Sequence, residues 1–290
     1  MGAGGLYPEE FPAQKSMLAD FWISRTEVTN REFAEFVDAT GYLTVAERQP
    51  NPEQYPNIDP QLLTAGSAVF VSPEEALVAG TPFNWWHFIE GANWRQPQGP
   101  GSDVDGKLYY PVVHMAFEDA QAYASWKGQR LPTEAEFEYA ARGGLVDKAY
   151  AWGDKPLGNG EYQANTWQGV FPFVDSAKDG YQGLAPVGCF AENGYGVNDM
   201  IGNVWEWTSS NYYPRHIDDE SAFDIYSSDK GFDPRQPATA VKTVKGGSYL
   251  CSPDFCARYR PAARQAQDTG LGSSHIGFRT AKSVSTKVES

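Results

Sequence analysis

The chain has 290 residues, 41% of them hydrophobic and 21% charged, which allows a full hydrophobic core and is typical of a folded globular protein. Its formal net charge of −14 disfavours nucleic acid and anionic membrane surfaces as partners. No apolar run reaches the roughly 20 residues of a membrane-spanning helix, and the N-terminus shows no signal peptide. Three cysteines are too few for an extracellular disulfide framework, so we expect a cytoplasmic protein.

The first predicted element is a helix in TEVTNREFAEFVDATGY. Thr29 and Glu32 have the spacing of a capping box, and Phe33, Phe36 and Val37 form one apolar face before a glycine. Residues 45–107 follow, rich in Pro, Gly, Asn and Gln, and predict a long irregular stretch. Its aromatic residues, in NWWHFIEGANWRQPQGP, argue against disorder.

Two further helices are predicted after this stretch. In FEDAQAYASW, Ala120, Tyr123 and Ala124 have helical spacing. In RLPTEAEFEYAARGG, Thr133 and Glu136 form a second capping box, and the glycine pair ends the helix. Both helices have the pattern of structural elements.

The last part of the chain predicts short strands between long connections, in GNVWEWTSS, AVKTVKGGSYL and HIGFRTA. No linker and no internal repeat divides the sequence. We therefore expect one α+β domain over residues 1–290, rich in loops, with a few helices and short, irregular antiparallel strands. Residues 1–12 and 283–290 are expected to be loose termini.

Two of the three cysteines lie together, in GGSYLCSPDFC. Cys251 and Cys256 could bind Cu(I), which accepts two or three soft ligands, or form a reactive redox pair. A structural disulfide would close too short a loop to stabilise much, and four histidines without a zinc spacing disfavour zinc. By spacing alone, two packed cysteines that never meet remain the simplest alternative. Cys189 is isolated and is predicted to be a small buried residue.

The sequence resembles the formylglycine-generating enzymes, also called sulfatase-modifying factors, of the bacterial type. The resemblance runs in order through EVTNREFAEFVDATGYLT, GANWRQPQGP, RLPTEAEFEYAARGG, ANTWQGVFP, NGYGVNDMIGNVWEWTS, GGSYLCSPDFCARYRPAAR and GFR. RLPTEAEFEYAARGG and GNVWEWT are shared with non-catalytic members of the wider superfamily, whereas the cysteine pair after GGS is specific to catalytic members. The resemblance implies a C-type-lectin-like fold.

The implied reaction is the oxidation, by O2, of a cysteine in an unfolded sulfatase segment Cys-x-Pro-x-Arg to Cα-formylglycine. In the family, the residues that correspond to Cys251 and Cys256 hold Cu(I) as thiolates, and the substrate thiolate joins them. The counterparts of Ser248 and Trp205 flank the O2 pocket. From the residues alone, Ser248 and Trp205 would be a satisfied strand serine and a core tryptophan.

The resemblance also implies two structural Ca2+ sites. One would use the Asn165 and Asp179 side chains with the carbonyls of Thr166 and Tyr181. The second is implied to use Asp199, Glu206 and the carbonyls of Gly202 and Val204. Without the resemblance, these Asn and Asp residues would be read as turn caps.

Aromatic residues of the long stretch are candidates for a substrate groove, namely Trp85, Trp86 and Trp94, although core packing explains them equally well. Arg258, Arg260 and Arg264 are expected to brace the fold through ion pairs, and Arg264 is also a second substrate-binding candidate. The acidic residues that bind the substrate arginine are not assigned.

The chain departs from the family at several positions. Ser252 stands where many catalytic members have His, and His275 lies near the end of the site segment. Residues at the disulfide positions of secretory relatives are Ala124, Ala141, Pro261 and Thr280, in agreement with a cytoplasmic enzyme.

Two alternatives remain beside a monomeric copper-dependent oxidase. One is a non-catalytic module that binds a peptide or glycan on the same scaffold; the cysteine pair argues against it. The other is a sulfoxide synthase of the ergothioneine type, which needs a histidine triad that this sequence lacks.

Overall fold

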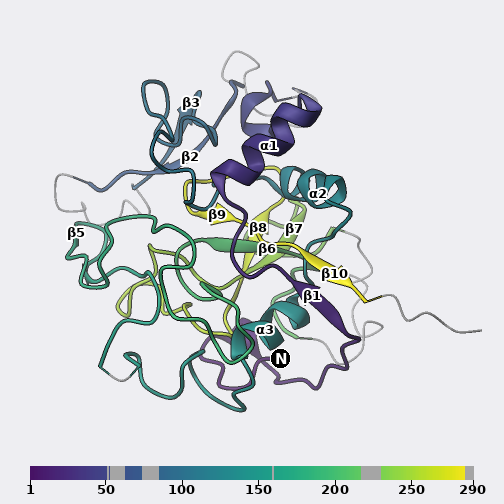
Figure 1. Cartoon of the computed structure of the whole chain (residues 1–290), viewed down its shortest axis with the longest axis vertical. Helices are drawn as coiled ribbons and strands as arrows, with labels where there is room; N and C mark the ends of the chain where they lie inside the picture. Colours follow the sequence, from purple (N-terminus) through teal and green to yellow (C-terminus); the bar gives the residue numbers. More distant parts are fainter. Residues whose placement is uncertain (51, 53–62, 74–84, 159, 217–229, 285–290) are drawn as a thin grey trace, which may run out of the picture.

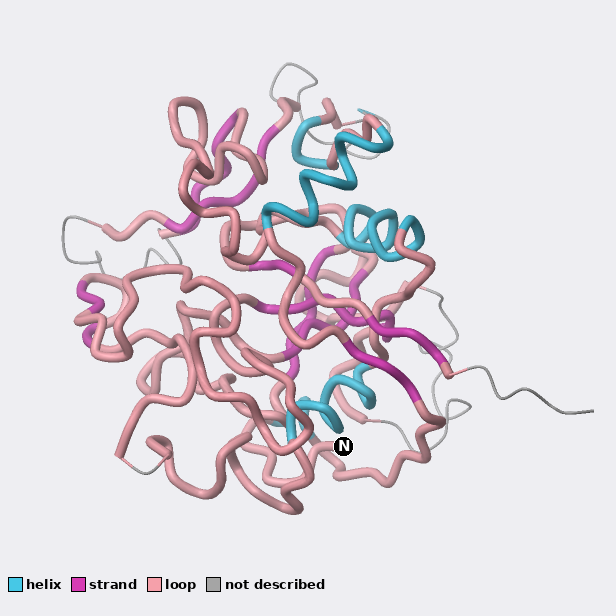
Figure 2. Tube along the Cα trace, viewed as in Figure 1, coloured by secondary structure: helices cyan, strands magenta, loops and turns pink. Residues whose placement is uncertain are grey.

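The computed structural model describes residues 1–50, 52, 63–73, 85–158, 160–216 and 230–284. Loops make up most of this chain, with few helices and short strands between them (Figure 2). The fold therefore confirms the expected loop-rich α+β class. No helix among the described residues is long and apolar enough to cross a membrane.

A four-stranded sheet in the order β8-β7-β6-β9 forms the centre of the molecule (Figure 1). Its strands are β6 (Trp205–Asn211), β7 (Val241–Lys245), β8 (Arg264–Asp268) and β9 (Ile276–Gly277). β7 pairs antiparallel with both β6 and β8, while β9 pairs parallel with β6. Trp205 and Trp207 of β6 are almost completely buried and connect the sheet to the main core.

Three helices surround the sheet. α1 (Asn30–Thr40) and α2 (Phe117–Trp126) lie together on one side, and α3 (Glu134–Arg142) packs against β6 and β7 on the other (Figure 1). The predicted capping boxes at Thr29 and Thr133 are both present, and Gly41 and Gly143 end their helices in the left-handed conformation. All three predicted helices are therefore confirmed.

Three strand pairs of the described residues lie outside the central sheet, and one of them joins the two ends of the chain. β1 (Phe21–Ile23) pairs with β10 (Ala281–Ser283), and β4 (Gly169–Val170) pairs with β5 (Val174–Asp175). β2 (Gly66–Phe70) pairs with β3 (Trp86–Glu90) inside the stretch predicted to be irregular. Short 3-10 turns occur at η1 (Pro8–Glu10) and η2 (Val45–Glu47).

The predicted loose N-terminus is wrong. Glu10 is completely buried and pairs with Arg260 at 2.5 Å, and the Gly2 amide donates to Glu138 Oε1 at 2.8 Å beside α3 (Figure 1). Ser283 belongs to β10, and residues 285–290 lie outside the described residues. The first ten residues are therefore packed against the folded domain, held by Gly2 and Glu10.

Candidate active site

The two neighbouring cysteines meet in space. Their sulfur atoms are 3.0 Å apart, and the side chains are 1% and 9% exposed for Cys251 and Cys256. The Gly246–Gly247 pair shapes this segment, since both glycines have positive φ and a Cβ at Gly247 would lie 3.0 Å from the Arg258 carbonyl oxygen. The simplest alternative from spacing, two cysteines that never meet, is therefore excluded.

The sulfurs face a cavity of about 370 Å³. Its wall contains Ser248 and Trp205, both predicted to flank the reactive centre, and Trp85 and Trp86, predicted as groove walls. The remaining lining residues are Phe171, Arg235, Leu250, Phe255, Arg258, Gln265 and His275.

Aromatic contacts fix much of this wall. Phe171 stacks on Phe255 with ring centroids 4.3 Å apart, and Trp86 lies 4.6 Å from the His275 ring. Sequence reasoning did not single out Phe171 or Phe255, although both occur in quoted motifs. Arg235 and Gln265 had no recognisable signal in the sequence.

The electrostatics of the two sulfurs differ. Burial, followed by the hydrogen bond with Cys256, raises the pKa of Cys251 well above its ordinary value. The hydrogen bond from Cys251 outweighs burial at Cys256 and, with the Arg258 guanidinium, lowers its pKa to about 7. Cys256 is therefore the more readily ionised sulfur of the pair.

His275 contributes a neutral imidazole to the cavity. Its Nδ1 lies 2.7 Å from Ser273 Oγ, and burial, followed by the nearby His114, lowers its pKa to about 3. The ring is thus uncharged at physiological pH and acts in the cavity as a polar wall.

Two substrate-binding predictions are not supported by the positions of the side chains. Trp94 belongs to the main core, 5.2 Å from the Phe33 ring, and does not line the cysteine cavity. Arg264 is buried and donates to Glu134 at 2.6 and 2.9 Å, because a buried guanidinium needs a counter-ion. Both residues stabilise the fold instead.

Cys189 was predicted to be buried, and this is wrong. It is an exposed free cysteine, in a turn after Gly188. Isolation in the sequence did not indicate burial, since the surrounding loop follows the surface.

The expected ion pairs of the arginine cluster are confirmed. Arg258 contacts Glu9 at 2.6 Å, Arg260 contacts Glu10 at 2.5 Å, and both acids come from the N-terminal segment. The disulfides of secretory relatives have no counterpart, since the chain's three cysteines are all free.

The cysteine pair fits Cu(I) by its donor set. Two buried sulfurs in contact, one with a lowered pKa, are soft ligands that face a cavity large enough for a third. Among the described residues, no group of three or more His, Cys, Asp or Glu side chains is arranged to hold a metal ion.

The first predicted calcium site has converging oxygen atoms. Asp179 Oδ2 accepts from the Thr166 amide at 2.9 Å and from Gln168 Nε2 at 2.6 Å, and the same Gln168 nitrogen contacts the Thr166 carbonyl. Asn165 donates to the Gly183 carbonyl at 2.8 Å, while Asp179 Oδ1 accepts from the Tyr181 amide at 3.0 Å. Carboxylate and carbonyl oxygens are the ligand type that Ca2+ prefers. In this structure, the Gln168 side-chain amide lies between two of them, Asp179 Oδ2 and the Thr166 carbonyl oxygen.

The second predicted site has an excess of buried negative charge. Glu206 accepts from Arg279 at 2.7 and 2.8 Å, and Asp199 accepts from the Gly188 amide. Glu27, which no sequence motif marked as a ligand, is buried beside them, and its Oε2 has no hydrogen-bond partner. Burial, followed by Asp199, raises the pKa of Glu27 well above its usual range. Buried negative charge therefore gathers around the single guanidinium of Arg279, and the Gly202 and Val204 carbonyls stay predicted ligands.

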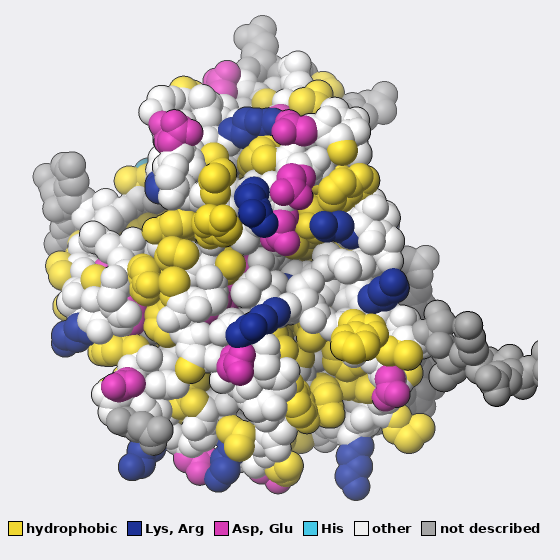
Figure 3. Space-filling model, viewed as in Figure 1, with side chains coloured by type: hydrophobic (Ala, Val, Ile, Leu, Met, Phe, Trp, Pro, Cys, Tyr) yellow, Lys and Arg dark blue, Asp and Glu magenta, His cyan; other side chains and the backbone are white. Residues whose placement is uncertain are grey.

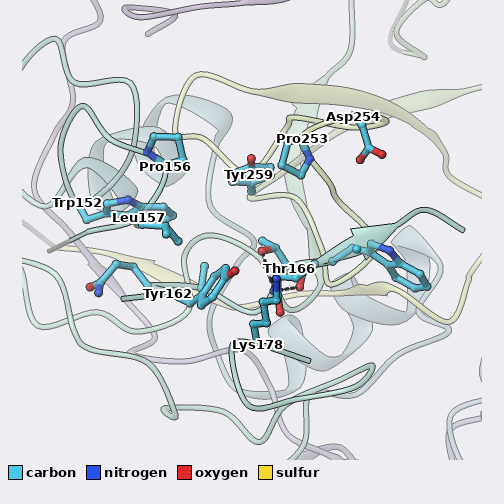
Figure 4. A pocket seen from close by; sticks show the side chains of 14 residues that line it. Trp152, Pro156, Leu157, Tyr162, Thr166, Lys178, Pro253, Asp254 and Tyr259 are labelled. Carbon is cyan, nitrogen blue, oxygen red and sulfur yellow. Dashed lines mark hydrogen bonds between the residues drawn. The ribbon is translucent and has the colours of Figure 1, made fainter. Parts of the chain in front are cut away.

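A second cavity, of about 400 Å³, contains no cysteine (Figure 4). Pro253, Asp254 and Tyr259 line it from the cysteine segment, and Thr166 and Lys178 lie opposite. The Trp167 amide donates to the Cys251 carbonyl at 3.0 Å and joins its wall to that segment. This cavity therefore adjoins both the cysteine centre and the first calcium site.

The chain is similar over most of its length to known proteins. The chain is 47% identical over 279 residues to the formylglycine-generating enzyme of Mycobacterium tuberculosis, covering 96% of this chain and 93% of that protein. It is also 37% identical to two relatives named inactive C-alpha-formylglycine-generating enzyme 2, from Mus musculus and Bos taurus. The match to the mouse protein spans 282 residues, which are 95% of this chain and 79% of the mouse protein.

The fold also matches solved structures. PvdO from Pseudomonas aeruginosa superimposes with a TM-score of 0.58 at 25% identity, over 97% of this chain and 87% of PvdO. The family model described as "Sulfatase-modifying factor enzyme 1-like domain" matches residues 1–284. This chain belongs to that family.

Proposed function

We propose that Cys251 and Cys256 bind Cu(I), and that this formylglycine-generating oxidase uses O2 there to oxidise a sulfatase cysteine to formylglycine. The identity with formylglycine-generating enzymes supports the reaction. Relatives named inactive also match over most of the chain, so similarity alone does not identify the reacting groups. The observation that carries the proposal is the 3.0 Å contact between two buried sulfurs beside a cavity.

The protein's own residues would hold the copper ion, orient the substrate and shield the reacting atoms from water. When bound, Cu(I) supplies the redox chemistry through which O2 oxidises the substrate carbon. Cys251 and Cys256 bind as thiolates, and the Arg258 guanidinium offsets their negative charge. Ser248 offers a hydroxyl donor beside the apolar wall of Trp205, which keeps water from the reacting atoms.

The client is an unfolded segment with the sequence Cys-x-Pro-x-Arg. Trp85, Phe171 and Phe255 give the cavity apolar walls that can bury the residues next to the reacting cysteine. Two guanidinium groups, Arg235 and Arg258, also line it. Like charges repel, so we place the substrate arginine outside this cavity.

Two Ca2+ ions complete the proposed enzyme as structural cofactors. They would use the carboxylates and carbonyls described above, at positions that join the long loops to β6. We propose that the enzyme acts in the cytoplasm as a monomer, before its sulfatase folds.

The direct test uses copper-loaded protein, O2 and a reductant with a Cys-x-Pro-x-Arg peptide. In the net reaction, the thiol carbon loses two electrons and two protons and exchanges its sulfur, released as hydrogen sulfide, for an oxygen from water. O2 accepts those two electrons and two more from the reductant, with four protons, and forms two water molecules. We expect a product with that mass change, which an aldehyde-specific hydrazide also traps. A Cys256→Ser variant should leave the peptide unmodified.

Two results would contradict the proposal. Normal turnover by Cys256→Ser would remove the cysteine pair from the reaction. Tight binding of the peptide by the wild-type chain without any change in mass would instead identify a non-catalytic binding module.

A further inference from the structure

The N-terminal segment, residues 7–10, contacts the chain directly after Cys256. The Ala257 amide donates to Tyr7 Oη at 3.0 Å, across 250 positions of sequence. Arg258 donates to Glu9 Oε1 at 2.6 and 3.2 Å, and its guanidinium lies 3.8 Å from the centre of the Tyr7 ring. Two successive residues after Cys256 are thus held by the same short segment.

Arg258 connects this support to the reactive cavity. It lines the cavity together with both cysteines, and only 20% of its side chain is exposed. A long flexible side chain has many rotamers, and a charge-assisted hydrogen bond selects one of them. Glu9 and the Tyr7 ring hold the guanidinium from two directions.

Glu10, next to Glu9, binds a different arginine, which does not line the cysteine cavity. It is completely buried and binds Arg260, which also donates to the carbonyls of Gly4 and Ala257. This pair secures the segment to the core without lining the cysteine cavity. Glu9 is 14% exposed at its side chain and can be changed with less damage to the fold.

We propose that Glu9 and Tyr7 are positioning residues of the cysteine centre, which hold Arg258 and the Ala257 backbone so that Cys256 keeps its place beside Cys251. The proposal rests on the function proposed above. It extends the active site to the opposite end of the sequence, where no motif marks it.

The test measures both structure and turnover in Glu9→Gln and Tyr7→Phe. Glu9→Gln removes the counter-ion of Arg258 while keeping the side-chain shape. Tyr7→Phe removes the acceptor for the Ala257 amide and leaves the ring. In the metal-free full-length protein, we expect amide hydrogen exchange across residues 252–258 to accelerate at least about fivefold in each variant, because a lost support lets the segment open locally.

Turnover separates positioning from simple tethering. In copper-loaded Glu9→Gln, we expect kcat on the peptide to fall about tenfold while KM stays within about twofold, since the reacting groups are misplaced and the substrate walls are intact. Glu9→Asp, which keeps the charge, should recover part of kcat. The control is Asp154→Asn, which removes an exposed ion pair to Lys148 of 2.7 Å, away from the cysteine cavity, and should change neither exchange nor kcat.

Two results would contradict a positioning role for Tyr7 and Glu9. Unchanged exchange at residues 252–258 in both variants would overturn the proposal, as would faster exchange with wild-type kcat. A wild-type chain that cannot modify the peptide would reject the proposed function, whereas the exchange data would still show whether Tyr7 and Glu9 hold the cysteine segment.

Discussion

Glu134 shows how a single buried carboxylate depends on its partners. Its oxygens accept from Arg264 at 2.6 and 2.9 Å, and Lys245 Nζ lies 3.7 Å away. Burial acts to raise its pKa, but the attraction of Arg264, with His216 and Lys245, outweighs burial and holds the pKa well below its ordinary value. Folding therefore favours the charged form of Glu134.

The low pKa of Glu134 makes the stability of the fold depend on pH. A depressed carboxyl pKa contributes stability above the unfolded-state pKa, near 4.5, and that stability is lost as the pH falls through this range and below. Glu134→Gln should therefore lower the free energy of unfolding at pH 7 by about 3 kcal/mol, since the buried Arg264 loses its counter-ion.

Urea denaturation at pH 7, 5 and 4 would measure this effect. The difference in unfolding free energy between wild type and Glu134→Gln should shrink as the pH falls. An exposed acid, Glu118, provides the control, and Glu118→Gln should show no such trend. A constant difference across the pH range would show that Glu134 is not a linked group.

Single residues were predictable where their neighbours in sequence decide their position. Cys251, Cys256 and Ser248 lie within one short segment, and together with Trp205 they line one cavity as predicted. Arg264 lies eight positions after Cys256, yet it points to Glu134 because a distant carboxylate binds it. No local pattern could reveal that partner.

Elements with local signals were equally predictable. The capping boxes gave the starts of α1 and α3, because Thr and Glu three residues apart satisfy each other's backbone groups. The β2–β3 hairpin was missed because distant contacts hold it. Ser67 Oγ donates to the Gly272 carbonyl at 2.7 Å, and the Phe70 amide donates to Ser274 Oγ at 3.0 Å.

The capping box of α3 makes a prediction at the same scale. Thr133 Oγ1 accepts from the Glu136 amide at 3.2 Å, and the Thr133 amide donates to Glu136 Oε2 at 2.8 Å. Thr133→Ala should lower the free energy of unfolding by about 1 kcal/mol, as for other lost N-caps. Thr133→Ser keeps the hydroxyl and should retain most of this stability in urea denaturation. Equal losses in both variants would indicate that the threonine methyl group, and not the cap, stabilises α3.

The whole molecule carries a net charge of −14. On the face drawn in Figure 3, acidic and basic side chains are interspersed among hydrophobic ones. Part of the excess is internal, at Glu27, Asp199 and Glu206, where Arg279 provides a single counter-charge. Long loops that cover such a cluster gain stability from a bound divalent cation.

Calcium should therefore stabilise the whole fold. At a free Ca2+ concentration about 100 times the dissociation constant, each site contributes about 2.7 kcal/mol, because the ion binds only the folded state. For a chain of this size that corresponds to a rise of about 5 °C in Tm per site. Thermal unfolding in calcium and in a chelator measures the difference.

Two variants separate the calcium sites. Asp179→Asn weakens the first site and should remove part of the calcium-dependent rise in Tm. Glu27→Gln removes one carboxylate from the second cluster, so it should reduce the response of Tm to calcium. Identical wild-type Tm values in calcium and in chelator would reject both sites, because an ion that binds only the folded chain must shift its unfolding.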